Sequence, residues 1–365
     1  MRTSRARTTM IAGLAVLALA TAACSSNSSS TSGGGGSGVA LTGAGATFPD
    51  PIYEQWFEQF KAVQPGTSIN YQAIGSGGGV EQFTAKTVDF GASDAPLQTD
   101  EISALPGPYI EVPTVLGGVV IAYNVSGLES GLKLDGATAA KIFQGQITTW
   151  NDPAIAALNP GVTLPATPIS VVHRSDDSGT TFVFTSWLSS QSKAWESAVG
   201  ADKSVNWPTG TGGDGNDGVA AAISQTDGSI GYLSFDFAVS SGLGIADIKR
   251  NDGTYVTPSV ESISKAGGDL KLPISPDTNI LNAKAQGAYP IASTTYLLLY
   301  KDETDAAKAQ AIFDFVTWAL TTGQASVKQL NYSPLPSAVA TQALHALSEM
   351  TANGQTMTAS GSVSG

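Results

Sequence analysis

One short stretch of the chain, residues 173–184, combines residue types that bind an oxyanion. An apolar run precedes it and aromatic residues follow, which predicts a strand, a polar turn and a helix start. Ser178 and Thr180 are candidate helix caps, and Gly179 lets the backbone approach a ligand. The free N–H groups of a helix start favour an anion, and Arg174 adds a fork of donors. An ordinary capped helix with a surface arginine explains the same residues, so both interpretations stay open here.

Three earlier turns follow the same order of strand, turn and helix. In the first, Thr47 and Phe48 follow a glycine-containing turn, and Thr47 is a candidate helix cap. The second contains Ser76 within the glycine-rich segment 75–79, which a flexible surface loop would also explain. The third carries Asp94, as a turn-forming residue or as part of a site. Because ligands of open α/β sheets lie at the carboxyl ends of strands, we expect the four turns to converge on one cleft.

Neither glycine-rich turn is a nucleotide motif. The first lacks the third glycine of the dinucleotide fingerprint, because Phe48 stands there, and the second lacks the Gly-Lys-Ser/Thr of a Walker loop. Because the formal net charge is -12, any anion site must work locally, through dipoles and a few placed donors.

The composition indicates a large globular protein that is not built to bind nucleic acid. The chain has 365 residues, of which 42% are hydrophobic and 13% are charged, and its formal net charge is -12. Such a length predicts two domains, and the negative charge argues against nucleic acid or an anionic membrane surface as a partner. With one cysteine, Cys24, and two histidines, His173 and His345, we expect no internal disulfide, no metal site and no cofactor.

The amino-terminal segment has the features of an export signal. Arginines precede an apolar run that is too short for a confident membrane span, so residues 1–24 are predicted to be a signal peptide. Small residues before Cys24 resemble a bacterial lipoprotein signal, although Thr21 stands where leucine is usual. That resemblance implies a lipid such as palmitate on Cys24 and anchoring on the extracytoplasmic face of the cell membrane. A plain signal peptide with an incidental cysteine is the alternative. Residues 25–38 are rich in Ser and Gly and predict a flexible tether.

Other segments must supply the scaffold for the four turns. The apolar run at 112–123 predicts a buried strand or crossover, and 307–320 is the clearest helix, with Gly323 placed to end it. Residues 251–288 are polar and show no clear pattern. The tail after Thr351 is small and polar, and we expect it to fray.

The four turns together carry a family resemblance. Residues 42–49, 75–80, 88–96 and 174–180 resemble the signature segments of phosphate-binding lipoproteins of the phosphate-uptake ABC transporter. The resemblance extends from about residue 41 to 336. Four motifs in the same order make it far more specific than any one of them.

This resemblance implies an α/β, two-lobed periplasmic-binding-protein fold, with crossing hinge strands and a ligand cleft between the lobes. The first lobe would combine residues 39–115 and 290–365, and the second would be residues 116–289. The protein would bind inorganic phosphate and deliver it to ABC transporter permease subunits, with no catalytic residues.

Eight residues of the motifs would touch the phosphate: Thr47, Phe48, Ser76, Asp94, Arg174, Ser178, Gly179 and Thr180. Thr47 and Phe48 would donate mainly through backbone N–H groups, and Asp176 would hold the Arg174 guanidinium. Asp177 departs from the family pattern, in which glycine is more usual. The resemblance also suggests how phosphate is selected over sulfate, because Asp94 can accept a hydrogen bond from the proton that phosphate keeps near neutral pH and sulfate lacks.

Two other functions remain as alternatives. A secreted phosphatase or esterase would use Ser178 as its nucleophile, but no full Gly-x-Ser-x-Gly elbow surrounds it. His173 is close in sequence, yet in a strand it points to the face opposite its neighbour Arg174. A receptor for another oxyanion, or an adhesive surface lipoprotein, would use the same fold for a different ligand.

Overall fold

A computed structural model describes residues 38–363 of the chain. They belong to one compact unit that spans Ser37–Gly365. The predicted signal peptide at 1–24, the lipidation of Cys24 and nearly all of the tether at 25–38 lie outside the described residues. Between residues 38 and 363, no helix combines the length and the apolar sequence that a membrane span requires.

One nine-stranded sheet forms the framework of the fold. Its strands are β1 (Val39–Gly45), β2 (Thr67–Ala73), β3 (Phe90–Ser93), β4 (Tyr109–Asn124), β6 (Ser170–Arg174), β7 (Thr211–Gly213), β8 (Ser229–Ser234), β9 (Gly244–Ile245) and β12 (Ala292–Tyr300). They are ordered β2-β1-β3-β12-β4-β8-β6-β7, and β9 also pairs with β4. The predicted strands at the four motifs are thus all present in one sheet.

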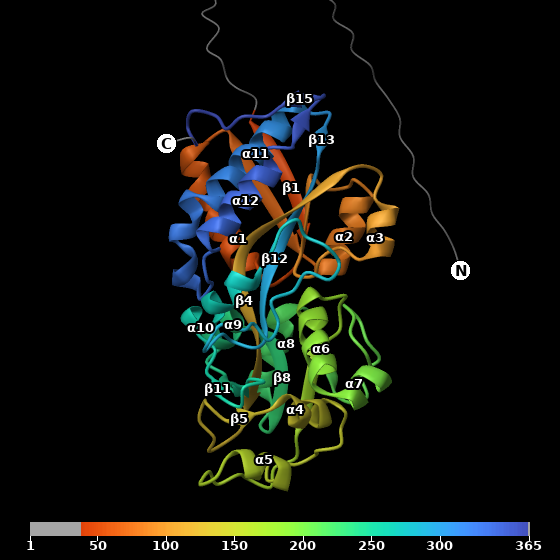
Figure 1. The fold of residues 1–365 in the computed structure, drawn as a ribbon, viewed down its shortest axis with the longest axis vertical. Helices are drawn as coiled ribbons and strands as arrows, with labels where there is room; N and C mark the ends of the chain where they lie inside the picture. Colours follow the sequence, from red (N-terminus) through yellow and green to blue (C-terminus); the bar gives the residue numbers. More distant parts are fainter. Residues whose placement is uncertain (1–37, 364–365) are drawn as a thin grey trace, which may run out of the picture. The chain divides into compact units, whose positions relative to one another are not determined.

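Strand β4 is shared by the two ends of this sheet. Residues 109–118 of β4 pair with β12, and residues 119–124 pair with β8, in both cases antiparallel. Figure 1 shows β4 passing from the helices around β1 to the group that surrounds β8. The predicted apolar crossover at 112–123 is therefore the strand that connects the motifs before it to those after it.

Two small sheets flank the large one. The first has the order β11-β10-β5 and the second β13-β14-β15. Their strands are β5 (Lys133–Leu134), β10 (Asp247–Lys249), β11 (Tyr255–Val256), β13 (Asp302–Glu303), β14 (Thr351–Ala352) and β15 (Gln355–Thr356).

Helices cover the sheet and bury its apolar side chains. They are α1 (Asp50–Val63), α2 (Ser76–Thr84), α3 (Thr99–Ala104), α4 (Gly136–Phe143), α5 (Pro153–Leu158), α6 (Gly179–Gln191), α7 (Lys193–Ala198), α8 (Gly215–Gln225), α9 (Phe235–Ser240), α10 (Val260–Ala266), α11 (Ala306–Leu320) and α12 (Ser337–Leu347), with short 3-10 turns η1 (Gly267–Asp269), η2 (Thr322–Ala325) and η3 (Val327–Leu330). In α1, Ile52, Trp56 and Phe60 recur at helical spacing and are buried. Burying each such side chain contributes about 1.5–3 kcal/mol, so this stripe fixes α1 on the core.

Two predictions about the scaffold are wrong, for Gly323 and for the tail, and the segment without a clear pattern contains a helix. The polar segment 251–288 contains α10, which a capping box at Ser259 starts and in which Ile263 is buried. Gly323 does not end α11; it lies in η2, where its carbonyl oxygen accepts a hydrogen bond from Trp56 Nε1 at 2.9 Å. The tail after Thr351 is paired rather than frayed, because β14 pairs with both β13 and β15. Short helices and paired tails depend on distant contacts that local periodicity does not show.

Candidate functional site

Turns at the carboxyl ends of four strands carry the predicted anion-binding residues. Strand β1 is parallel to β2 and β3, and its last residue Gly45 pairs with Ala73 and Ala92. Gly45 is required there, because its φ is +148° and a Cβ atom would lie 2.0 Å from the carbonyl oxygen of Ala92. The fourth turn follows β6, which is parallel to β7 and β8. The first three turns therefore begin at one edge of the sheet.

Residues of three of these turns are in direct contact. The amide of Asp94 donates to Ser76 Oγ at 3.1 Å, and Thr180 Oγ1 donates to Asp94 Oδ2 at 3.4 Å. A Cβ atom on Gly179 would lie 2.4 Å from Ser76 Oγ and 2.7 Å from Asp94 Cβ. Only glycine leaves room at this point, so the start of α6 reaches the turns after β2 and β3.

Arg174 lies at the end of β6 and is 3% exposed. Its Nε donates to Asp176 Oδ1 at 2.7 Å, and its Nη2 pairs with Asp176 Oδ2. The amide of Gly215 donates to the same carboxylate at 3.2 Å. The ion pair orients the guanidinium and leaves its Nη1, which is buried, without a hydrogen-bond partner among the described residues.

Thr47 and Phe48 contribute the turn after β1. Thr47 Oγ1 accepts from the side-chain and backbone N–H groups of Asn216, at 2.9 and 3.4 Å, so its hydroxyl proton is free to donate elsewhere. The predicted cap by Thr47 is wrong, because α1 starts after Pro49 without a side-chain cap. The Phe48 ring packs on Gly117, where a Cβ atom would lie 2.1 Å from it. The amides of Thr47 and Phe48 have no acceptor among the described residues.

The start of α6 supplies further free donors. Ser178 is its N-cap, as predicted, and Ser178 Oγ accepts from the amide of Thr181 at 3.2 Å. Thr180, the other predicted cap, lies inside the first turn instead. The amides of Gly179 and Thr180 precede the first intrahelical hydrogen bond and have no acceptor in the described part of the chain. With the dipole of a 13-residue helix behind them, they favour an anion.

Asp94 is the acidic group of this cluster. It is 5% exposed, and its Oδ1 has no hydrogen-bond partner among the described residues. Burial raises the pKa of Asp94 to about 7, although the nearby Thr295 hydroxyl, which donates to the carbonyl oxygen of Ser93, and the charge of Arg174 lower it. Buried polar atoms are normally hydrogen-bonded, and here Asp94 Oδ1 and Arg174 Nη1 both lack a protein partner. The charge of Arg174 reaches Asp94, but Arg174 lines a different cavity, with His173 and Lys203, from the one beside Asp94. A ligand that both accepts and donates hydrogen bonds has the groups that the two atoms lack.

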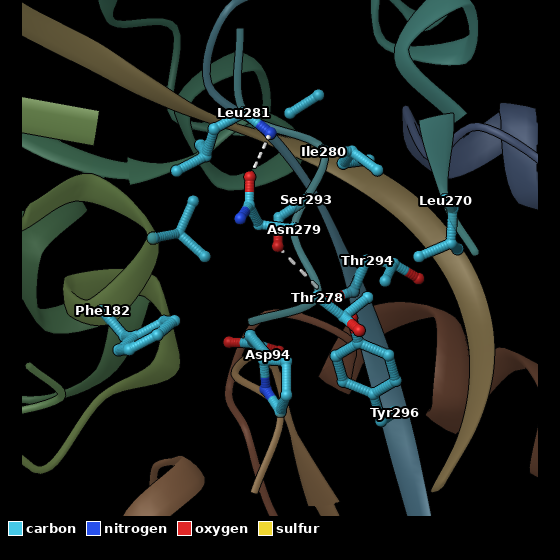
Figure 2. Close-up of a pocket in the computed structure, with 13 residues that line it drawn as sticks. Asp94, Phe182, Leu270, Thr278, Asn279, Ile280, Leu281, Ser293, Thr294 and Tyr296 are labelled. Carbon is cyan, nitrogen blue, oxygen red and sulfur yellow. Dashed lines mark hydrogen bonds between the residues drawn. The ribbon is translucent and has the colours of Figure 1, made fainter. Parts of the chain in front are cut away.

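A small cavity of about 20 Å³ adjoins Asp94. Figure 2 shows the Asp94 carboxyl directed into it between Phe182 and Tyr296, with Thr278 and Asn279 on the far side. Such a cavity holds about one water molecule. This side of Asp94 therefore has no room for an organic group.

Asp177, the departure from the family pattern, does not contact the guanidinium. Its carbonyl oxygen accepts from the amide of Gly77 at 2.9 Å, and a Cβ atom on Gly77 would lie 1.9 Å from its carboxylate. Burial raises the pKa of Asp177, and the charge of Lys203 lowers it. Asp177 thus packs against the start of α2 while Asp176 pairs with Arg174.

The geometry does not favour a serine nucleophile. Ser178 is fully buried and its Oγ is engaged as the helix cap. His173 stacks on Trp207, with ring centroids 5.0 Å apart, and its Nδ1 contacts the carbonyl oxygen of Arg174. Neither ring nitrogen therefore activates Ser178. Within residues 38–363, no three His, Cys, Asp or Glu side chains are grouped as metal ligands.

Sequence reasoning missed two residues that contact this site, Asn216 and Tyr332, and a third, Asp236, that contacts Tyr332. Asn216, at the start of α8, binds Thr47 and also accepts from the amide of Ser234 at 3.1 Å. Tyr332 donates to the carbonyl oxygen of Phe48 at 2.6 Å and lies 2.8 Å from Asp236 Oδ2. The Gly-rich segment 207–218, which contains Asn216, was a sequence signal for the first contact. The Tyr332 contacts had none, because they join segments that are distant in sequence.

The fold and the buried polar cluster define a ligand-binding protein of the periplasmic-binding class, and the model of the PBP superfamily domain matches residues 25–322. The phosphate-binding protein PstS of Xylella fastidiosa (strain Temecula1) is 42% identical over 301 residues, which cover 82% of this chain and 82% of that protein. PstS 2 of Mycobacterium tuberculosis (strain H37Rv) is 40% identical over 314 residues, covering 81% of this chain and 83% of that protein. The chain belongs to the PstS family of phosphate-binding proteins, as the four motifs indicated.

Solved structures confirm the predicted α/β periplasmic-binding-protein fold. PfluDING, a high-affinity periplasmic phosphate-binding protein solved with bound phosphate, is similar with a TM-score of 0.67 and 24% identity, covering 83% of this chain and 92% of that one. A human phosphate binding apolipoprotein is similar with a TM-score of 0.67 and 23% identity, covering 83% and 93%. At these identities the likeness shows the fold alone.

Proposed function

We propose that the chain binds inorganic phosphate outside the cytoplasm and delivers it to the permease subunits of a phosphate ABC transporter. Membership of the PstS family supports the ligand and the transport role. The single observation that carries the proposal is the pair of buried atoms, Asp94 Oδ1 and Arg174 Nη1, that lack protein partners within the described residues. Phosphate near neutral pH offers what both need, because it carries oxygens that accept and a hydroxyl that donates.

Each of the predicted contact residues has a donor or acceptor suited to phosphate. Arg174 supplies the positive charge, and Asp176 fixes its orientation. The amides of Thr47, Phe48, Gly179 and Thr180 donate without reorganisation, because the turns already hold them. Free hydroxyl protons come from Thr47, whose oxygen already accepts from Asn216, and from Ser178, whose oxygen already accepts from Thr181. The remaining hydroxyls of the set belong to Ser76 and Thr180.

Asp94 makes the site selective for a protonated anion. An ionised Asp94 accepts the phosphate hydroxyl, whereas sulfate presents only lone pairs and negative charge to it. Leaving a buried polar group unpaired costs about 1–3 kcal/mol, and more for a charge. Sites built to hydrogen-bond one hydroxyl reject an analogue that lacks it by roughly 10⁴-fold or more. We therefore expect phosphate to bind and sulfate to be excluded.

Titration calorimetry of the chain lacking residues 1–24 tests this function. Phosphate should bind at one site, and sulfate should give no heat under the same conditions. A panel of other oxyanions distinguishes a receptor for a different ligand, and failure of phosphate to bind would reject the proposal. A chromogenic phosphoester should not be turned over, since the PstS family consists of binding proteins and not enzymes.

We also propose that Cys24 carries the lipid that anchors the protein on the extracytoplasmic face of the cell membrane. The small residues before Cys24 support this, and the Ser/Gly-rich residues 25–38 would form the tether. Labelling of cells with a palmitate analogue should mark the wild-type protein and not the Cys24→Ser variant. If both proteins are released unlabelled, a plain signal peptide explains the segment.

A further inference from the structure

The hydroxyl of Tyr332 lies between two acceptors. It is 2.6 Å from the carbonyl oxygen of Phe48 and 2.8 Å from Asp236 Oδ2, and Tyr332 is fully buried. A phenol carries one proton, and a peptide carbonyl never donates. Both contacts are hydrogen bonds only when Asp236 is protonated and donates to Tyr332, which in turn donates to Phe48.

The surroundings of Asp236 favour its neutral form. It is 6% exposed at the start of α9, and its Oδ1 has no hydrogen-bond partner among the described residues. Helix α9 packs on β4, β8 and α8, and Figure 1 shows it beside β4. These elements contain no Lys, Arg or His. Their titratable residues are Tyr109, Glu111 and Tyr123 on β4, Tyr232 on β8 and Asp217 on α8.

Other carboxyls act on Tyr332, the hydrogen-bond partner of Asp236. Asp50 and Asp94 both act on Tyr332, whose pKa burial holds well above its usual range. Burial likewise raises the pKa of Asp236 to about 7, although the hydroxyls of Ser234 and Tyr332 nearby and the amides of Asp236 and Phe237 at the start of α9 lower it. The described elements that pack on α9 carry no Lys, Arg or His, and the amides at the start of α9 offset burial only in part, so protonation of Asp236 is the arrangement that the packing supports.

This chain of hydrogen bonds ends on the phosphate turn. Phe48 contributes an amide to the proposed site, its carbonyl oxygen accepts from Tyr332, and its ring meets the Tyr332 ring edge to face at 5.4 Å. Asp236 belongs to the segment predicted as the second lobe, and Phe48 and Tyr332 belong to the first. The three residues therefore connect the anion turn to the opposite side of the proposed cleft.

We propose that protonated Asp236 and Tyr332 are positioning residues for phosphate, and that ionisation of Asp236 releases the turn that carries Phe48. On ionisation the proton of Asp236 passes to solvent, and Tyr332 then has one proton for two acceptors. The carboxylate takes it, because charge-assisted hydrogen bonds are the stronger ones, and the Phe48 carbonyl is left unpaired. The inference rests on the proposed phosphate function and adds a pH dependence that Asp94 alone does not supply.

Phosphate titrations of the full-length chain in detergent, from about pH 5.5 to 8.5, test this on wild type, Asp236→Asn and Tyr332→Phe. The Asn side chain donates to Tyr332 at every pH. Asp236→Asn should therefore match wild type within about threefold at the acidic end and bind roughly tenfold more tightly at the alkaline end. Tyr332→Phe should bind phosphate about tenfold more weakly than wild type at the acidic end. There the wild-type protein keeps both hydrogen bonds, from Asp236 to Tyr332 and from Tyr332 to Phe48. Asp252→Asn, an exposed change on the surface, is the matched control and should follow wild type throughout.

Phosphate and Asp94 also titrate in this pH range, and they do so in wild type and in every variant. Dividing the affinity of each variant by that of wild type at the same pH therefore cancels their effect. A constant affinity ratio between Asp236→Asn and wild type would overturn the inference. Carbon-13 NMR of the aspartate carboxyls, without phosphate, is the independent measurement. The resonance that Asp236→Asn removes should titrate near neutral pH, and a carboxylate already ionised at about pH 5.5 would also overturn it. If wild type bound no phosphate at any pH, the proposed function would fail, while the NMR titration would still test Asp236.

Discussion

At the scale of single residues, the proposed discrimination between phosphate and sulfate depends on one buried carboxyl. Asp94 is placed by its own amide on Ser76 and by the hydroxyl of Thr180, so its free oxygen is held in one direction. A ligand with a hydroxyl group donates a hydrogen bond to that oxygen. A ligand without one places its own negative charge against the carboxylate. The same buried carboxyl therefore stabilises one anion and excludes the other.

Asp94→Asn should reduce this selectivity. The amide of asparagine can donate to sulfate, and it removes the negative charge that repels a fully ionised anion. We expect the ratio of phosphate to sulfate affinities to fall by at least about tenfold, equivalent to about 1.4 kcal/mol. Calorimetry with both anions measures it, with Asp252→Asn as the control. If the ratio of phosphate to sulfate affinities is unchanged in Asp94→Asn, a group other than Asp94 accepts the hydrogen bond from the phosphate hydroxyl.

At the scale of elements, the close approach of α6 to two other turns sets the size of the site. Gly179, the first residue of α6, touches both Ser76 and Asp94. The helix can approach so far because Ser178 satisfies the amide of Thr181 and because nothing projects from Gly179. The free amides of Gly179 and Thr180 are thereby placed next to Ser76 and Asp94 on the other turns.

Gly179→Ala should abolish tight binding without unfolding the protein. Its methyl group would lie 2.4 Å from Ser76 Oγ and 2.7 Å from Asp94 Cβ, so α6 must move away. We expect a loss of at least about 100-fold in phosphate affinity, or about 2.7 kcal/mol. Gly107→Ala is the control, since a Cβ atom there meets nothing within 4 Å. Thermal unfolding of both variants without phosphate checks that the fold is retained.

Strand β4 carries another buried carboxyl, Glu111, which is outside the proposed site. Its Oε1 accepts from the amide of Leu97 at 2.8 Å, and burial raises its pKa from 4.5 to about 7. Between these values the folded protein holds the proton more tightly than the unfolded chain. Ionisation of Glu111 therefore lowers the free energy of unfolding as the pH rises from about 4.5 to about 7, and the contribution of Glu111 is constant above that range.

Glu111→Gln should remove this loss, because the neutral amide still accepts from Leu97. Without phosphate, the variant should equal wild type at about pH 4.5 and be more stable at about pH 8, by at most roughly 3 kcal/mol. Thermal unfolding at both pH values measures the difference. Glu58→Gln, on the exposed face of α1, should leave the wild-type pH dependence intact. Equal stability of Glu111→Gln and wild type at the higher pH would contradict the argument.

The strands, turns and helix starts that carry the four motifs could be predicted from the sequence. The residues of distant segments that contact these turns could not. Each motif is local: an apolar strand, a turn with glycine and a helix start occupy a short stretch that periodicity and capping residues reveal. Asn216, Asp236 and Tyr332 reach the site from distant segments, and no local pattern indicates which turn they contact. The roles of Thr47 and Gly323 were mistaken for the same reason, since tertiary hydrogen bonds replace the caps that their sequence positions suggest.

At the scale of the whole molecule, contacts join the two segments that are predicted to be lobes. The amide of Gly77 donates to the carbonyl oxygen of Asp177 at 2.9 Å, and Asn216 binds Thr47. Lys203 is 4% exposed and pairs with Glu101 of α3, while its carbonyl oxygen accepts from the amide of Ser178. If the lobes open to release phosphate, all of these contacts must break together.

Glu101→Gln should therefore speed the release of phosphate. The glutamine can keep the hydrogen bond that Glu101 Oε2 accepts from the amide of Gln98, so α3 retains its capping box. It removes the charge opposite Lys203, whose burial is tolerable in the closed form only with a partner. Opening returns Lys203 to water, so the substitution favours the open form. We expect the dissociation rate to rise about 3- to 10-fold with little change in the association rate.

Stopped-flow dissociation of phosphate from wild type and Glu101→Gln measures this directly. The matched control is Glu196→Gln, which removes an ion pair with Lys193 that lies within α7 and is exposed, with side-chain exposures of 48% and 90%. An exposed pair of this kind contributes about 0–1 kcal/mol and joins no separate segments, so its loss should leave both rates unchanged. Equal dissociation rates for Glu101→Gln and wild type would show that the Lys203 pair is not broken when phosphate leaves, and that the two predicted lobes do not separate at this contact.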